Sequence, residues 1–442
     1  MSVPSSPGPI RVGHVLTSLS EGGLERFALT LATNLPKEGF EVRIYSLLKK
    51  NPWIDAFLDR EIPVTVIGGD NRPGLISCPI NALALLRLAW HLHRDRIDVV
   101  HAPDFYPAAM ARIASVLARV PARVHTLHSV YDWYSPRVFR VQRFLGRFTD
   151  AVTAVSVPAL EFSKIRERQP PSKYRLIRNG ADEQRFRPDL QARSRERYRW
   201  GWKDDDLVVG SVGARTPRKG HPLLAQGIVP LMERDPHLRL AILGAVSDRY
   251  PDTRPEVERI ARAHGVLDRV HFLEPRDDVE NFFAAIDVHC MPSEVEGLSF
   301  AAIEGILSGC VSVFSDLPAF RELVVPGRTG YLFQRDDCAS LRQMLVQALA
   351  IRHWEPAFPD RCRKLAIERF GQSRMVALYA QLYREILAAK RGTSMAFADE
   401  PGSQRGLLPG ITLGGPAGRQ GMRRDQRTSL ELELSESERP RA

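Results

Sequence analysis

The sequence is poor in the features that mark membrane, secreted and metal-binding proteins. Its 442 residues include five cysteines, which are scattered and form no CxxC pair. Reduced packing residues are therefore expected, not a disulfide framework or a zinc site. Apolar runs are short and broken by charge, whereas a transmembrane helix needs about 20 apolar residues. No basic segment precedes an apolar core at the N-terminus, so no signal peptide is expected. Together these absences predict a cytoplasmic protein.

The charge balance is basic, which raises the question of an acidic partner. The 62 lysines and arginines outnumber the 52 aspartates and glutamates, and the formal net charge is +10. Nucleic acid, an anionic membrane surface or an acidic small ligand would each suit that charge. The chain lacks a helix-turn-helix signature, a zinc knuckle and an RNP-type aromatic strand, so no nucleic-acid partner is expected. Histidines and carboxylates show no metal-ligand spacing, so no metal is expected.

The most informative stretch is 293–304, which is rich in small and acidic residues. An apolar run at 286–291 precedes it and predicts a buried strand, and a helix is expected at 300–307. A strand that enters a helix through such a turn offers free backbone N–H groups and the helix dipole to a phosphate. Glu296 and Glu304 bracket the turn, and they would lie roughly 12 Å apart if the residues between them were helical. The stretch therefore suits an elongated phosphate-bearing ligand.

Strands and helices alternate along most of the chain. In the first half, strands are expected at 10–16, 42–47, 63–67, 98–101, 123–128, 151–156 and 175–177. In the second half, they are expected at 207–212, 238–243, 270–273, 286–291, 311–315 and 330–333. Such alternation predicts two parallel sheets that are covered by helices on both faces, with ligands at the carboxyl ends of the strands.

The alternation breaks once near the middle and stops near the end. Residues 182–206 are charged and separate the two halves, so one domain is expected over 1–185 and a second over 186–369. A long amphipathic helix is expected at 370–390. Residues 391–442 are rich in glycine, arginine, serine and glutamate with few aromatics, and they are predicted to be disordered.

Four stretches in order resemble those of a known family. They are Gly22-Gly23-Leu24-Glu25-Arg26, residues 177–182 with Phe186, residues 212–215 with Lys219-Gly220, and Glu296-x7-Glu304. On these residues the chain resembles a family-four retaining glycosyltransferase of the GT-B fold, over about residues 10–386. Any one stretch would be weak, but four in the right order make the resemblance specific.

The resemblance implies a fold and a reaction. The fold would be α/β, with two doubly wound Rossmann-like domains that face a cleft. The first domain would bind the acceptor, the second would bind the nucleotide sugar, and the final helix would cross back to the first. The reaction would be transfer of a hexose to an acceptor hydroxyl with retention of configuration and without a metal or other cofactor. The acceptor could be a glycan, a glycolipid or a small molecule.

Two basic residues are implied on the diphosphate of the donor. Fixed positive charge lowers the barrier to breaking the sugar–phosphate bond, because negative charge builds on the leaving group. The family places a matching arginine and lysine there, which implies Arg215 and Lys219. In the family this pair is commonly five residues apart, whereas here it is four, so Arg218 competes for either role. The alternative is a pair of solvated loop charges.

The two glutamates are implied at opposite ends of the donor. Glu304 resembles the residue that holds the ribose hydroxyls, and a carboxylate can accept both of their hydrogen bonds. Glu296 resembles the catalytic residue that contacts the transferred sugar, either to orient its hydroxyls or to steady positive charge on the ring. Glu294 is a close neighbour but lacks the spacing to Glu304. The alternative for Glu304 is an ordinary exposed helix glutamate.

Backbone groups are expected to complete the donor site. The N–H groups of Gly297, Leu298 and Ser299 would donate to the phosphates. Gly22 and Gly23 would let the backbone of the first domain approach the donor closely. A simple tight turn is the alternative for this glycine pair.

A histidine is implied beside the reacting sugar. His128 ends the predicted strand at 123–128, on the side that should face the cleft, and it resembles the catalytic histidine of the family. His125 and His101 are its competitors. A structural role is the alternative for any of the three.

A basic amphipathic segment lies at 136–148. Arg137, Arg140, Arg143 and Arg147 alternate there with apolar residues. This pattern suits peripheral contact with an anionic membrane, here on its inner face. The alternative is an ordinary packed helix with a solvated basic side.

Other functions on the same fold stay open. One is a nucleotide-sugar epimerase or hydrolase, and a phosphorylase would need a pyridoxal-binding lysine context that is not found. Another is a degenerate scaffold that binds nucleotide without turnover. Retaining hydrolases use two carboxylates about 5 Å apart, and no such partner for Glu296 is found. The resemblance to the family implies same-face attack instead, in which the leaving phosphate helps to deprotonate the acceptor.

Overall fold

The computed structural model describes residues 8–20, 22–69, 79–132, 134–247 and 250–392. The tail predicted to be disordered, 391–442, lies outside the described residues except for its first two positions. Cys78 also lies outside them.

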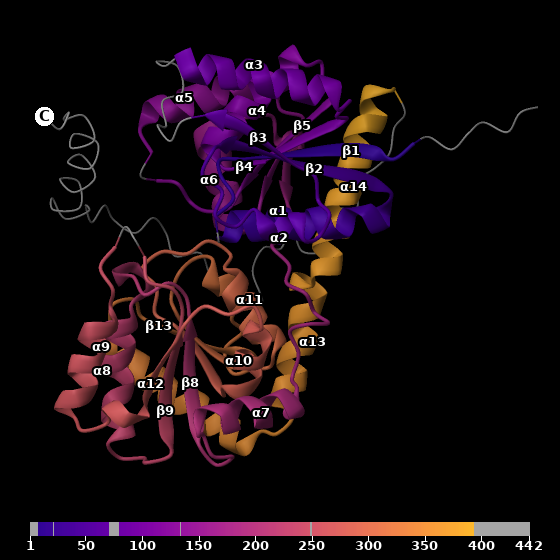
Figure 1. The fold of residues 1–442 in the computed structure, drawn as a ribbon. Helices are drawn as coiled ribbons and strands as arrows, with labels where there is room; N and C mark the ends of the chain where they lie inside the picture. The colour runs from indigo at the N-terminus through magenta and orange to yellow at the C-terminus, as the bar shows by residue number, and fades with distance from the viewer. Residues whose placement is uncertain (1–7, 21, 70–78, 133, 248–249, 393–442) are drawn as a thin grey trace, which may run out of the picture. The chain divides into compact units, whose positions relative to one another are not determined.

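The first sheet contains seven parallel strands in the order β3-β2-β1-β4-β5-β6-β7. Its strands are drawn in indigo to magenta in Figure 1. The strands are β1 (Ile10–Leu16), β2 (Phe40–Leu48), β3 (Val64–Gly69), β4 (Val99–Pro103), β5 (Ala122–Leu127), β6 (Ala151–Ala154) and β7 (Tyr174–Leu176). The helices between them are α1 (Gly23–Asn34), α2 (Asp55–Leu58), α3 (Pro79–Arg94), α4 (Phe105–Leu117), α5 (Pro136–Leu145) and α6 (Val157–Glu167). The strand order reverses between β1 and β4, which pair directly. Their carboxyl ends therefore form a topological switch point, where open α/β sheets bind ligands.

The second sheet contains six parallel strands in the order β10-β9-β8-β11-β12-β13. The strands are β8 (Leu207–Val212), β9 (Leu238–Leu243), β10 (Val270–Leu273), β11 (Val288–Met291), β12 (Val311–Ser315) and β13 (Gly330–Phe333). Its helices are α7 (Leu190–Trp200), α8 (His221–Met232), α9 (Arg254–Ala263), α10 (Val279–Ala285), α11 (Phe300–Leu307), α12 (Cys338–Trp354) and α13 (Phe358–Phe370). The helix α14 (Gln372–Lys390) follows them in the sequence. Here the order reverses between β8 and β11, which creates a second switch point.

The prediction of two parallel sheets in an α/β fold is confirmed, and β8, β9, β10, β12 and β13 have the predicted bounds. The helix α13 was not predicted. Its buried residues recur every four positions at Phe358, Cys362, Ala366 and Phe370, but charged residues between them hide the stripe. The residue boundaries proposed for the domains, at 185 and 369, stay a prediction.

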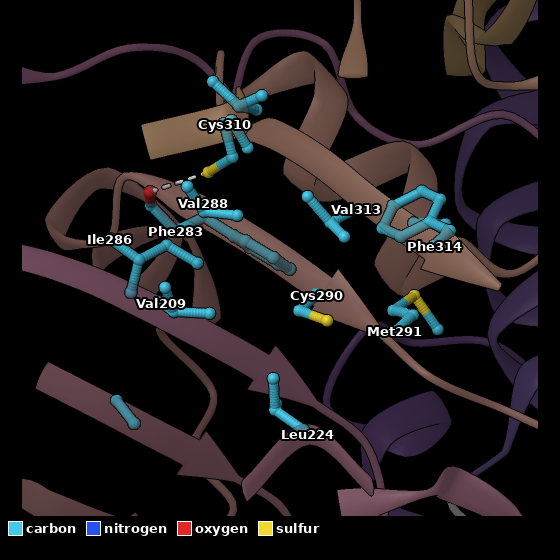
Figure 2. Close-up of a cluster of buried hydrophobic side chains, with 14 of the residues drawn as sticks. Val209, Leu224, Phe283, Ile286, Val288, Cys290, Met291, Cys310, Val313 and Phe314 are labelled. Carbon is cyan, nitrogen blue, oxygen red and sulfur yellow. Dashed lines mark hydrogen bonds between the residues drawn. The ribbon is translucent and has the colours of Figure 1, made fainter. Parts of the chain in front are cut away.

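Apolar side chains fill the space between the second sheet and its helices (Figure 2). Val209, Val288 and Val313 are fully buried on the neighbouring strands β8, β11 and β12. The Cys310 thiol donates a hydrogen bond to the Phe283 carbonyl at 3.3 Å (Figure 2). Cys290, Cys310 and Cys362 are buried, and Cys338 is half-buried.

The helix α14 packs into the core of the first sheet although it is the last described helix in the sequence. The Tyr383 hydroxyl lies 2.6 Å from Nδ1 of His101 on β4. The Tyr379 hydroxyl lies 3.2 Å from the Thr153 hydroxyl on β6. These buried polar contacts fix the register of α14 on the sheet. Among the described helices, none is both long and apolar enough to cross a membrane.

Candidate active site

Loops from both switch points line one cavity of about 580 Å³ within the unit formed by residues 1–403. The loop after β1 contributes Gly22 and Gly23, and Asp104 follows β4 directly. The loop after β8 contributes Lys219, and the turn after β11 contributes Glu296. This turn, residues 292–299, is called the Glu296 turn below.

The Glu296 turn is not helical. The helix α11 begins only at Phe300, so the 12 Å spacing expected from a continuous helix does not apply. Glu296 instead accepts two hydrogen bonds on Oε1, from Lys219 Nζ at 2.5 Å and from the Ser293 hydroxyl at 3.0 Å. Gly297, Leu298 and Ser299 follow Glu296 along the cavity wall. The turn therefore presents its carboxylate and the N-terminus of α11 at one place.

The loop after β8 is locked against the Glu296 turn. The Glu294 N–H donates to the Arg218 carbonyl at 3.0 Å. Gly220 has φ 71°, and a Cβ at this position would lie 2.1 Å from the Pro292 carbonyl oxygen. Only glycine combines that backbone conformation with so close an approach. The lock holds Lys219 beside Glu296.

The place of Arg215 on the donor diphosphate stays a prediction, because its side chain is paired elsewhere in this structure. Its side chain is buried and ion-paired with Glu274 at 3.2 Å and with Asp252 at 3.4 Å, and it is absent from the cavity wall. Ala214 and Arg218 line the cavity instead. Because Arg215 and Lys219 are four residues apart, Ala214 takes the position five residues before the lysine.

His128 lines the cavity, whereas His101 and His125 do not. The His128 ring packs edge-on against Phe27, with centroids 4.7 Å apart. Burial lowers the pKa of His128 to about 3, so its imidazole is neutral at physiological pH. Its Nε2 atom has no hydrogen-bond partner among the described residues. His101 is bound to Tyr383 in the sheet core, which gives it a structural role.

Two glycine contacts bring the chain segments together at this wall. A Cβ on Gly297 would lie 2.1 Å from the His128 carbonyl oxygen, so the Glu296 turn fits there only with glycine. Gly23 faces the Phe300 ring, which a Cβ would meet at 4.0 Å. Both segments that were predicted to approach the donor therefore border the same space.

Glu304 borders a second cavity of about 900 Å³, which shares Arg26, Arg276 and Phe300 with the first. The Glu304 carboxylate is buried and pairs with Arg26 at 3.1 Å. Burial raises the pKa of Glu304, and Arg26 opposes that shift. Glu296 and Glu304 thus line two neighbouring cavities that share three wall residues.

Asp104 and Tyr131 also line the first cavity and were not singled out from the sequence. The signal for Asp104 was present, because it lies between the predicted strand at 98–101 and the helix that follows, at a carboxyl strand end. Tyr131 lies in a loop without periodicity, and no sequence signal marked it.

Among the described residues, one group of side chains has metal-ligand proximity: Asp205, Asp206 and His237. It lies outside the wall of either cavity. Asp206 is already bound to Arg239 at 2.5 Å. The group therefore has no part in the site described above.

Comparison with solved structures identifies the class of fold. The chain is similar to Anabaena Alr3699/HepE in complex with UDP, with a TM-score of 0.74, 21% identity, and coverage of 85% of this chain and 100% of that one. It is also similar to WaaG, a glycosyltransferase involved in lipopolysaccharide biosynthesis, with a TM-score of 0.64, 18% identity, and coverage of 84% and 99%. With the two doubly wound sheets, these similarities define a GT-B fold.

Sequence comparison identifies the family. Residues 21–185 match Glycosyltransferase Family 4, and residues 206–350 match Glycosyl transferases group 1. The UDP-Gal:alpha-D-GlcNAc-diphosphoundecaprenol alpha-1,3-galactosyltransferase of Escherichia coli is 23% identical, over 87% of this chain and 100% of that protein. The D-inositol 3-phosphate glycosyltransferase of Saccharomonospora viridis is 28% identical, over 85% of this chain and 92% of that protein. The chain belongs to the family-four, group 1 glycosyltransferases.

Proposed function

We propose that this glycosyltransferase moves a hexose from a nucleotide-sugar donor to an acceptor hydroxyl, with retention of configuration and without a metal. The observation that carries the proposal is the Lys219–Glu296 pair, 2.5 Å apart in a cavity built from two switch-point loops. One cation for a diphosphate and one carboxylate for a sugar stand side by side there. This is the arrangement that cleavage of a sugar–phosphate bond requires.

The positive wall of the cavity is assigned to the donor diphosphate. Lys219, Arg218 and the backbone N–H groups before Phe300 would meet the negative charge that builds on the leaving phosphate. The N-terminus of α11 adds its dipole in the same sense. Glu304 in the neighbouring cavity would hold the ribose hydroxyls, in place of its present contact with Arg26.

Glu296 and His128 are assigned to the transferred sugar. A diphosphate that draws Lys219 away would leave the Glu296 carboxylate free to contact the sugar. His128 is neutral, so its free ring nitrogen would orient a sugar hydroxyl without adding charge. In same-face attack, the bond from the sugar C1 to the phosphate oxygen breaks as a bond from C1 to the acceptor oxygen forms. The acceptor proton passes to the phosphate oxygen that leaves.

A donor panel tests this proposal. The purified protein is incubated with UDP-, GDP- and ADP-sugars, including UDP-galactose and GDP-mannose, with and without EDTA, and nucleoside diphosphate release is measured. We expect slow release from one donor, unaffected by EDTA, and NMR of the transfer product should show the anomeric configuration of the donor. Nucleotide binding without turnover of any donor would favour a scaffold, and an inverted product would exclude retention.

We also propose that α5 touches an anionic membrane. Arg137, Arg140, Arg143 and Arg147 are all exposed on α5 and the turn that follows it. Phe144 is 56% exposed beside them, and the Arg147 guanidinium lies 5.7 Å from the centre of its ring. Exposed aromatic and basic residues on one surface suit a peripheral contact with acidic headgroups.

A further inference from the structure

Asp104 is the carboxylate on the first-sheet side of the cavity wall, and the donor contacts do not use it. It follows β4 at the switch point and precedes α4, whose Phe105 N–H donates to its Oδ1 at 2.7 Å. Its backbone has φ 63° and ψ 169°, a conformation that is almost confined to glycine. An aspartate is therefore held where glycine would be the less strained choice.

The neighbours of Asp104 make this side of the cavity acidic. The Tyr131 hydroxyl donates a hydrogen bond to the Asp104 carboxylate. Glu25 on α1 lies close enough for the Asp104 charge to raise its pKa, although burial of Glu25 contributes more to that rise. Arg26 is the cation that the first sheet adds to the described wall, and it is paired with Glu304 at 3.1 Å. The opposite side carries Arg218 and Lys219.

We propose that Asp104 binds the hydroxyl of the acceptor, and that the acceptor is an uncharged sugar or polyol where it meets this wall. The inference deepens the proposed function and rests on it. An ionised carboxylate only accepts hydrogen bonds, so it is suited to a hydroxyl donor. A phosphate group at the same place would meet the like charge of Asp104, and Glu25 lies near Asp104 outside the cavity wall. Asp104 orients the hydroxyl, and the proton still passes to the leaving phosphate.

The Asp104→Asn variant tests the role of the charge. Asparagine keeps the side-chain oxygen for the Phe105 N–H and nearly matches aspartate in size, so the variant changes the charge with little change in shape. The acceptor probes are octyl glucoside, octyl galactoside and octyl mannoside, each compared with its 6-phosphate, with the donor that the wild type turns over. We expect transfer to the uncharged octyl hexosides to fall about 10- to 100-fold, while affinity for the nucleoside diphosphate changes less than about twofold. The wild type should prefer the uncharged acceptors.

Asp336→Asn is the matched control, because Asp336 is exposed and also has positive φ, at 62°. It should leave transfer and nucleotide affinity unchanged.

Equal or better use of the 6-phosphates would overturn the proposal, and so would undiminished transfer by Asp104→Asn. Loss of nucleotide affinity and Tm together would show a structural role instead, and a glycosyl adduct on Asp104 would show a nucleophile. Failure of the wild type to bind any octyl hexoside, with donor turnover intact, would also overturn it. Absence of donor turnover in the wild type would contradict the proposed function itself.

Discussion

Lys219 and Glu296 hold opposite charges in contact, so each satisfies the other until a donor arrives. The Glu296→Gln variant keeps the shape of the side chain and leaves Lys219 in place. We expect turnover to fall about 10²- to 10³-fold, because a preorganised charge at the sugar is lost. Affinity for the nucleoside diphosphate should hold, since Lys219 still meets the phosphates. Nucleotide release measures the first quantity and calorimetry measures the second.

Glu294→Gln is the control for this variant, because Glu294 lies in the same turn, is exposed and is absent from the cavity wall. Its turnover should match that of the wild type. Unchanged turnover in Glu296→Gln would reject the assignment of Glu296 to the sugar.

Arg215 and Arg218 should separate into a structural and a ligand-binding residue. Arg215→Met removes a buried cation from Glu274 and Asp252, which should lower the free energy of unfolding by about 1–3 kcal/mol and spare nucleotide affinity. Arg218→Met should weaken nucleotide binding about 10-fold and leave stability unchanged. Urea denaturation and calorimetry measure the two effects. The reverse pattern would restore Arg215 to the donor site.

For individual residues, the sequence indicated which side chains could bind a nucleotide sugar, but it did not indicate the direction of every side chain. Lys219, Glu296 and His128 could be placed because each lies at or near a predicted strand end. Arg215 could not, because one residue of spacing decides which side chain of a loop faces the cavity. Tyr131 could not, because its position depends on how its loop folds back onto Asp104.

The Glu296 turn has no room for added volume at Gly297. Gly297→Ala would place a Cβ 2.1 Å from the His128 carbonyl oxygen, so the turn or the His128 segment must move. We expect turnover to fall at least about 10-fold, because small displacements of reacting groups are costly. Kinetic assays check this, and Gly201→Ala, at φ 69° with open space around it, controls for a generic glycine effect. Equal activity of Gly297→Ala and the wild type would show that the turn is pliable.

The surface of α5 should respond to charge reversal. Arg140→Glu with Arg147→Glu should abolish binding to vesicles of phosphatidylglycerol and phosphatidylcholine in a flotation assay, because the electrostatic attraction is reversed. Arg259→Glu with Arg262→Glu is the matched control, on exposed arginines of α9. Equal flotation of both double variants, or none by the wild type even at low salt, would dispose of the membrane contact.

Element prediction succeeded where burial imposes a simple pattern. The strands of the second sheet are short continuous apolar runs, because helices cover both faces of a parallel sheet. The helix α13 was missed because its four buried residues are separated by arginines and lysines. Burial in that helix is decided by contact with α11, which a local pattern does not reveal.

At the scale of the whole molecule, buried neutral histidines make stability depend on pH. Burial lowers the pKa of His14, His128 and His289 to about 3. In the unfolded chain histidine titrates near its ordinary value of about 6.5, so the unfolded state binds more protons below that pH. The stability that depends on these neutral histidines is therefore fully present above pH 6.5, and it is lost as the pH falls toward 3. At pH 5, each of these histidines should lower the free energy of unfolding by roughly 2 kcal/mol.

Urea midpoints at pH 7.5 and pH 5 measure this loss. The His14→Phe variant should reduce the difference between them, because both ring nitrogens of His14 lack a hydrogen-bond partner among the described residues. Equal midpoints at the two pH values would contradict the expected dependence.

The packing of α14 on the first sheet constrains when that sheet can finish folding during synthesis. Tyr379 and Tyr383 fill the core beside His101 and Thr153, in a sheet whose own strands end at Leu176. About two hundred further residues must be synthesised before these tyrosines exist. At synthesis rates of about 5–20 residues per second, the face of the first sheet that α14 covers stays uncovered for roughly 10 to 40 seconds. The core of the first sheet is therefore closed only after α14 has left the ribosome.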